Sequence, residues 1–102
     1  MSGEKSEIER FLELLAYEQT LIGRYHGHKG QIKVAQAEAD YCEKMLDMEG
    51  ENMDDEAREY WEKKYIKAKG RVLYHKRMTE ETRKALEEVR KEIEEIKRRR
   101  RI

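Results

Sequence analysis

The chain has 102 residues, of which 45% are charged and only 8% are aromatic, and its formal net charge at pH 7 is zero. This length fits a single domain, residues 1–102, that is too small for a thick core, so we expect an elongated hairpin or an oligomer. No apolar run is long enough to span a membrane, and no signal-peptide segment is recognised. The single cysteine, Cys42, excludes an intrachain disulfide, and we expect a cytoplasmic, reducing compartment or cytosolic recombinant expression.

The first predicted element is a helix over about residues 5–49. Early in this segment one face carries Ile8, Phe11, Leu12, Leu15 and Ile22, and late in it another face carries Val34, Ala35, Tyr41, Cys42, Met45 and Leu46. On a wheel of 100° per residue these faces point in nearly opposite directions. The change falls within residues 23–30. Either a loop or bulge interrupts the helix there, or a continuous helix buries one face in its own hairpin and the other in a second subunit.

Three glycines, Gly23, Gly27 and Gly30, lie in that segment, spaced four and three residues apart. In a helix this spacing aligns them on one face with Thr20 and Val34. Each glycine costs a helix about 1 kcal/mol relative to alanine. Three of them within eight residues therefore indicate a break, a close approach of another helix, or space for a bound group. The last alternative makes these glycines candidate cofactor-binding residues.

The next predicted element is a turn over residues 50–53. Gly50 suits the left-handed position that ends many helices. Asn52 or Asp54 is expected to cap the helix that follows, and the acidic residues Asp54, Asp55 and Glu56 suit its positive N-terminus.

The second arm, over about residues 54–101, carries the strongest pattern in the chain. Its steps alternate between four and three residues through Trp61, Tyr65, Ala68, Val72, His75, Thr79, Thr82, Leu86, Val89, Ile93 and Ile96. A 3.5-residue repeat of this length predicts one long helix with one face against a partner. We therefore predict an all-α, coiled-coil-like antiparallel helical hairpin, completed to a four-helix or larger bundle by self-association.

The charges of the two arms are complementary. Residues 1–52 carry 6 lysines and arginines against 11 acidic residues, and residues 53–102 carry 17 against 12. Antiparallel arms around the turn place residues opposite each other when their numbers add up to about 103. Glu4, Glu7, Glu9 and Glu13 then lie beside the basic residues 97–101, and this charge pattern favours the antiparallel orientation.

The three histidines, His26, His28 and His75, are the candidate metal ligands. The register places His28 opposite His75, and the nearby glycines would leave room for a ligand. Three imidazoles would suit zinc with one open position, or they would ligate haem iron with the glycines admitting the flat ring. No Glu-x-x-His, His-x-x-x-His or Cys-x-x-Cys pattern occurs. The alternative is a polar layer that sets the register of the two helices.

The basic residues 97–101 would suit phosphates, nucleic acid or an acidic surface. No aromatic residue lies among these arginines to stack on bases, and cations are favoured at a helix C-terminus in any case. We therefore favour an ion-paired helix end here over a nucleic-acid site.

The opening Met1-Ser2-Gly3 and the idealised patterns at 79–89 and 91–98 resemble computationally designed helical bundles. This resemblance covers residues 4–22 and 79–102, and the middle of the chain departs from it. It implies a de novo protein that assembles with itself. No set of nucleophile, base and oxyanion donors is recognisable. We therefore predict a self-assembling scaffold without enzymatic turnover, with a histidine metal or haem site and a nucleic-acid-binding coiled coil as alternatives.

Overall fold

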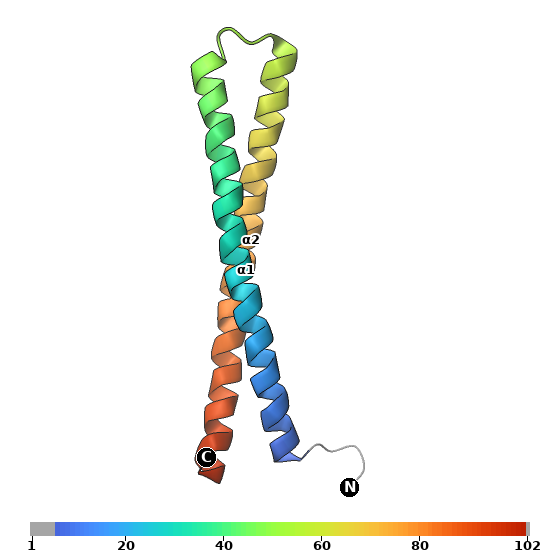
Figure 1. Ribbon diagram of the computed structural model, residues 1–102, viewed down its shortest axis with the longest axis vertical. Coiled ribbons are helices and arrows are strands. Elements are labelled where there is room, and N and C mark those ends of the chain that lie inside the picture. Colours follow the sequence, from blue (N-terminus) through green and yellow to red (C-terminus); the bar gives the residue numbers. More distant parts are fainter. Residues whose placement is uncertain (1–5, 102) are drawn as a thin grey trace. The chain divides into compact units, whose positions relative to one another are not determined.

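The computed structural model describes residues 6–101, which form two helices joined by a short turn (Figure 1). Helix α1 spans Glu7–Glu49 and helix α2 spans Asp55–Arg100. The predicted all-α antiparallel hairpin is therefore confirmed. The expected helix start at residue 5, the expected partner Glu4 and the Met-Ser-Gly opening lie outside the described residues.

Helix α1 begins with a side-chain cap and continues without interruption through residues 23–30. The Ser6 hydroxyl accepts a hydrogen bond from the Glu9 amide at 3.1 Å, which satisfies one of the free N–H groups at the helix start. Of the two alternatives for residues 23–30, the structure has the continuous helix, so no loop or bulge resets its phase.

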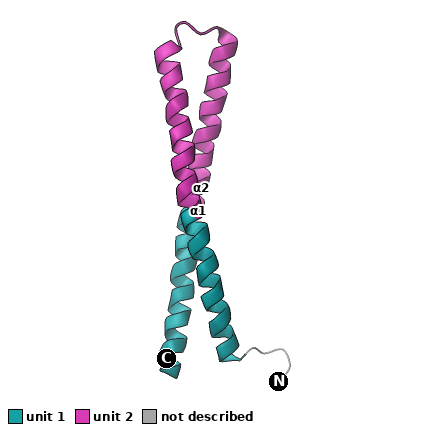
Figure 2. Ribbon diagram, in the orientation of Figure 1, with its two compact units in different colours: residues 1–26, 79–102 teal, residues 27–78 magenta. Residues whose placement is uncertain are grey.

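The described residues divide into two compact units, each of which pairs a segment of α1 with an antiparallel segment of α2 (Figure 2). Unit 1 takes its described residues from 6–26 and 79–101. Its core contains Leu14, Leu21, Leu86, Val89, Ile93 and Ile96, with Phe11, Leu15, Ile22, Tyr25 and Ala85 packed against it. Unit 2 comprises residues 27–78. Its buried residues are mostly small: Ala35, Ala39, Cys42, Ala68 and Val72.

The prediction that the 3.5-residue repeat of α2 forms its inward face is confirmed. In unit 2, Ala68 and Val72 are buried and Trp61, Tyr65 and His75 are half-buried; in unit 1, Thr79 is half-buried and Thr82, Leu86, Val89, Ile93 and Ile96 are buried. Helix α1 contributes a matching line with the same steps of three and four. This line runs through Phe11, Leu14, Glu18, Leu21 and Tyr25 in unit 1, and through His28, Ile32, Ala35, Ala39, Cys42 and Leu46 in unit 2.

The two apolar faces predicted for α1 are therefore only partly correct. Ile8 and Leu12 of the first face are 52% and 58% exposed, and Val34 and Tyr41 of the second are 60% and 56% exposed. The buried line follows a 3.5-residue period, which drifts by about 20° per heptad on a 3.6-residue wheel. This drift accounts for much of the apparent change of face between the two ends of the helix.

The turn lies where the sequence predicts it, but Gly50 does not act as expected. Its φ lies outside the left-handed region, and its amide donates to the Leu46 carbonyl at 3.0 Å. Glycine is required because a Cβ atom would collide with that same carbonyl oxygen. Asp54 caps α2, since its carboxylate accepts a hydrogen bond from the Ala57 amide at 2.8 Å.

Candidate functional site

Two of the three histidines meet in unit 2. The Nδ1 atoms of His28 and His75 are 2.8 Å apart, and the ring centroids are 5.1 Å apart. Both side chains are half-buried, and the ring of Tyr74 lies edge-on to each of them. Between two neutral imidazoles, one Nδ1–H donates to the lone pair of the other Nδ1. This contact confirms the register in which opposite residue numbers add up to 103.

The third histidine, His26, lies apart from this pair. It belongs to unit 1, is exposed, and contacts the ring of Tyr25 edge-on at 5.5 Å between centroids. Among residues 6–101 no group of three or more histidine, cysteine or acidic side chains is placed to hold a metal ion. The structure therefore brings together two of the three candidate ligands.

The distance within the histidine pair is that of a hydrogen bond. A zinc ion bound to both nitrogens at about 2.0–2.1 Å with tetrahedral angles would separate them by about 3.3 Å. Metal binding at this pair would thus require the rings to move apart by about half an ångström and to lose their mutual hydrogen bond.

The candidate cofactor-binding glycines lie on the outer side of α1. Gly23, Gly27 and Gly30 are exposed, and a Cβ added at any of them would meet nothing within 4 Å. They therefore do not serve to bring α1 and α2 closer together. They also do not open space around the imidazole of His28, which faces α2. A break in the helix is also excluded.

These glycines belong to an uncharged line on the exposed surface of α1, which we call the outer seam. Its members are Ala16, Thr20 and Gly23 in unit 1 and Gly27, Gly30, Val34, Ala37 and Tyr41 in unit 2. They follow each other at alternating steps of four and three residues, as in a coiled-coil seam. All eight are exposed. The sequence pattern placed Thr20, the glycines and Val34 on one helix face. Ala16, Ala37 and Tyr41 continue the same spacing but were not assigned to that face.

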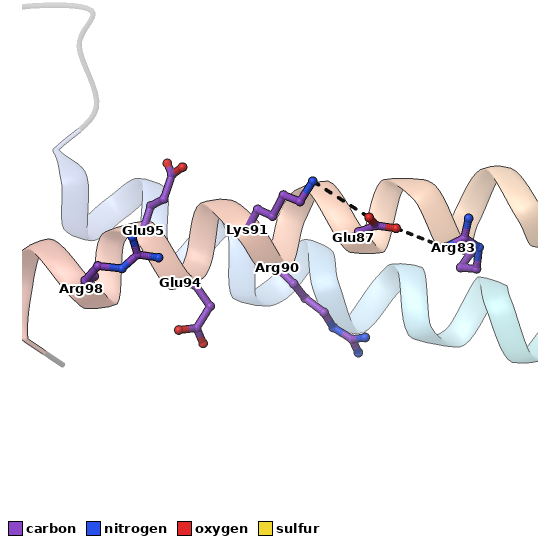
Figure 3. Close-up of a pocket in the computed structure, with 7 residues that line it drawn as sticks. All are labelled: Arg83, Glu87, Arg90, Lys91, Glu94, Glu95 and Arg98. Carbon is purple, nitrogen blue, oxygen red and sulfur yellow. Dashed lines mark hydrogen bonds and ion pairs between the residues drawn. The ribbon is translucent and has the colours of Figure 1, made fainter.

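The charged surface of α2 in unit 1 carries several ion pairs between neighbouring turns of the helix. Figure 3 shows a hollow there, lined by Arg83, Glu87, Arg90, Lys91, Glu94, Glu95 and Arg98. Arg83 donates to Glu87 at 3.1 Å and to Glu80 at 2.7 Å. The hydrogen bond with Arg83 lowers the pKa of Glu80, and that with Glu80 raises the pKa of Arg83.

The basic end of α2 is also ion-paired. Arg100 Nε lies 2.9 Å from one carboxylate oxygen of Glu7, and Arg99 Nη2 lies 3.5 Å from the other. These contacts match the predicted pairing of the acidic start of α1 with the basic end of α2.

No protein-family model, curated protein or solved structure matches this chain. Neither of the two described helices is apolar enough over a sufficient length to cross a membrane.

Proposed function

We propose that the protein is a self-associating helical scaffold without enzymatic turnover, and that a second copy of the chain covers the outer seam. The observation that carries this proposal is the absence of charge from eight successive seam positions on the exposed surface of a chain in which 45% of residues are charged. Ordinary exposed helix faces are polar.

The large apolar side chains on this surface support the same proposal. Val34 and Tyr41 lie in the seam, and Met48 continues its line one heptad beyond Tyr41 with 72% exposure. A row of exposed apolar residues at heptad spacing is typical of a helix that packs against a partner helix. Closed two-fold dimers are the commonest way for a protein to cover such a face.

The test is the mass in solution at micromolar concentration, measured by light scattering. We expect at least twice the chain mass of 12.4 kDa. Val34→Glu places a charge in the seam and is expected to shift the protein toward monomer. Ile66→Glu is the matched control, because Ile66 is similarly exposed but lies on α2. A monodisperse wild-type monomer would overturn the proposal.

A second candidate function, binding of a transition metal, is favoured by the facing imidazoles of His28 and His75. Zinc and haemin are each titrated into wild type and into His75→Ala, and the melting temperature is recorded. A specific site raises the melting temperature of the wild type by mass action, and the variant loses that gain. Because ligation requires neutral imidazoles, the gain should shrink in acid. If neither ligand shifts the wild type, the histidines only set the register.

A further inference from the structure

We infer that two copies pair antiparallel through their outer seams, about a two-fold axis that passes between the levels of Gly27 and Gly30. This inference rests on the proposed self-association and specifies its face, direction and register. Both parts of the seam lie on the one continuous helix α1. In this register, seam residues lie opposite each other across the two copies when their numbers add up to 57.

The sizes of the opposed side chains are complementary in this register. Each level places a larger residue of one copy against a smaller residue of the other, or two glycines together: Tyr41 with Ala16, Ala37 with Thr20, Val34 with Gly23, and Gly30 with Gly27. A parallel, in-register pair would instead set every residue against its own copy, so that Tyr41 meets Tyr41 at one level and Gly23 meets Gly23 at another. The helices would then be held apart at one level and leave a gap at another, which close packing disfavours.

The charges that bound the seam favour the same direction. The next positions along the line are Glu13 at one end and Lys44 at the other, both exposed, and their numbers also add up to 57. Antiparallel pairing places each glutamate opposite a lysine of the other copy. Parallel pairing would place like charges opposite each other. Such flanking charges set the partner and orientation of paired helices.

The register also explains the three glycines. Glycine permits the closest approach of two backbones but weakens a helix. Gly27 and Gly30 meet at the axis, where two crossing helices come closest, and Gly23 receives Val34 of the other copy. A partner of different sequence would not require this internal match between the two ends of one seam. The pattern therefore favours a second copy of this chain as the partner.

Disulfide trapping tests the direction of pairing. Chains carrying Thr20→Cys and chains carrying Ala37→Cys, each in a Cys42→Ala background, are mixed, oxidised and separated without reductant. We expect a cross-linked dimer in the mixture and little in either chain alone. Cross-linking of the Thr20→Cys chain with itself would indicate parallel pairing and overturn this inference, although the scaffold proposal would survive. A dimer by mass with no cross-link in any sample would also overturn it.

Bulky substitutions test the close approach at the axis. Gly27→Leu and Gly30→Leu are expected to raise the dimer dissociation constant at least tenfold while helicity stays the same or increases. Gly70→Leu is the matched control, because Gly70 is an equally open helical glycine on α2, and its dissociation constant should not change. Equal effects of Gly27→Leu and Gly70→Leu would contradict the inference.

Charge reversal tests the register itself. Glu13→Lys and Lys44→Glu should each weaken the dimer several-fold, and the double variant should recover most of the loss, because opposite charges then face each other again. Additive weakening in the double variant would contradict the register. If the wild type is a monomer, both this inference and the proposed function fall.

Discussion

The histidine pair shows what a single polar layer does inside a thin hydrophobic interface. His28 and His75 lie where the heptad pattern of each helix calls for an apolar residue, and each satisfies the other at 2.8 Å. A polar pair of this kind contributes little stability, but it penalises any shift of one helix along the other, because a shift would leave both imidazoles without this partner.

Replacing both histidines with leucine tests this role. We expect the His28→Leu/His75→Leu variant to gain about 1–3 kcal/mol in unfolding free energy, because two polar groups no longer need to be desolvated. Denaturant titration measures the unfolding free energy of both proteins, and a variant less stable than the wild type would contradict this expectation.

Gly50 lies at the end of α1 in a position with no room for a side chain. Because a Cβ atom would collide with the Leu46 carbonyl oxygen, we expect Gly50→Ala to lower the unfolding free energy by about 1–2 kcal/mol. Gly70→Ala is the control. It adds a methyl group in open space within a helix and should raise the unfolding free energy by about 1 kcal/mol. A stabilising Gly50→Ala would show that the collision is relieved by a small backbone shift.

The Glu80–Arg83 pair gives a pH-dependent contribution whose sign is determined by the lowered pKa of Glu80. The charged carboxylate favours the folded state, so the contribution is present above the ordinary glutamate pKa and is lost as the pH falls through the lowered value. In Arg83→Gln, the pKa of Glu80 should rise toward its ordinary range. Carboxyl NMR titration measures this, and an unchanged pKa would mean that the pair does not form in solution.

Among the elements, α2 has a first turn that combines a side-chain cap with acidic residues. Asp54 satisfies the Ala57 amide, and Asp55 and Glu56 follow at the positive end of the helix. We expect Asp54→Ala to lower the unfolding free energy by about 1 kcal/mol, within the usual range for capping residues. Asp55→Asn, which removes a charge but no observed cap, should have a smaller effect. If Asp54→Ala and Asp55→Asn lowered the unfolding free energy equally, the stabilisation would come from charge alone and not from the cap.

For the whole molecule, several ion pairs between α1 and α2 follow the charge difference between the arms, although Arg10 pairs with Glu92 in the opposite sense. In unit 1, Glu7 pairs with Arg99 and Arg100, and Glu18 pairs with Arg90. In unit 2, Arg71 pairs with Glu38. Each exposed pair contributes only about 0.2–1 kcal/mol, so their combined role is to favour the antiparallel arrangement.

The basic end of α2 provides a test at the same scale. Changing arginines 98–101 to glutamine should leave the mass in solution unchanged. At low salt, the wild type should bind single-stranded nucleic acid no more tightly than the variant, since Arg99 and Arg100 already have carboxylate partners. Salt-sensitive binding that the variant loses would instead support a nucleic-acid partner.

The sequence alone determined the features that depend on repetition and on turn chemistry. The 3.5-residue repeat from Trp61 to Ile96 predicted α2 and its buried face, and Gly50 and Asp54 marked the turn. Equal arm lengths then placed His28 opposite His75. These features are local, or they follow from simple counting along two paired helices.

Only the tertiary structure decided which face of α1 is buried. That helix carries two lines at heptad spacing, and the line that contacts α2 contains small or polar residues such as Ala35, Ala39 and Glu18, whereas Val34 and Tyr41 lie outside. Over residues 32–41 hydrophobicity alone does not distinguish these lines, because one contains Ile32, Ala35 and Ala39 and the other Val34, Ala37 and Tyr41. Burial there depends on which side chains fit against the partner helix. Only the structure showed that the glycines point outward, where an added Cβ atom would meet nothing within 4 Å among residues 6–101.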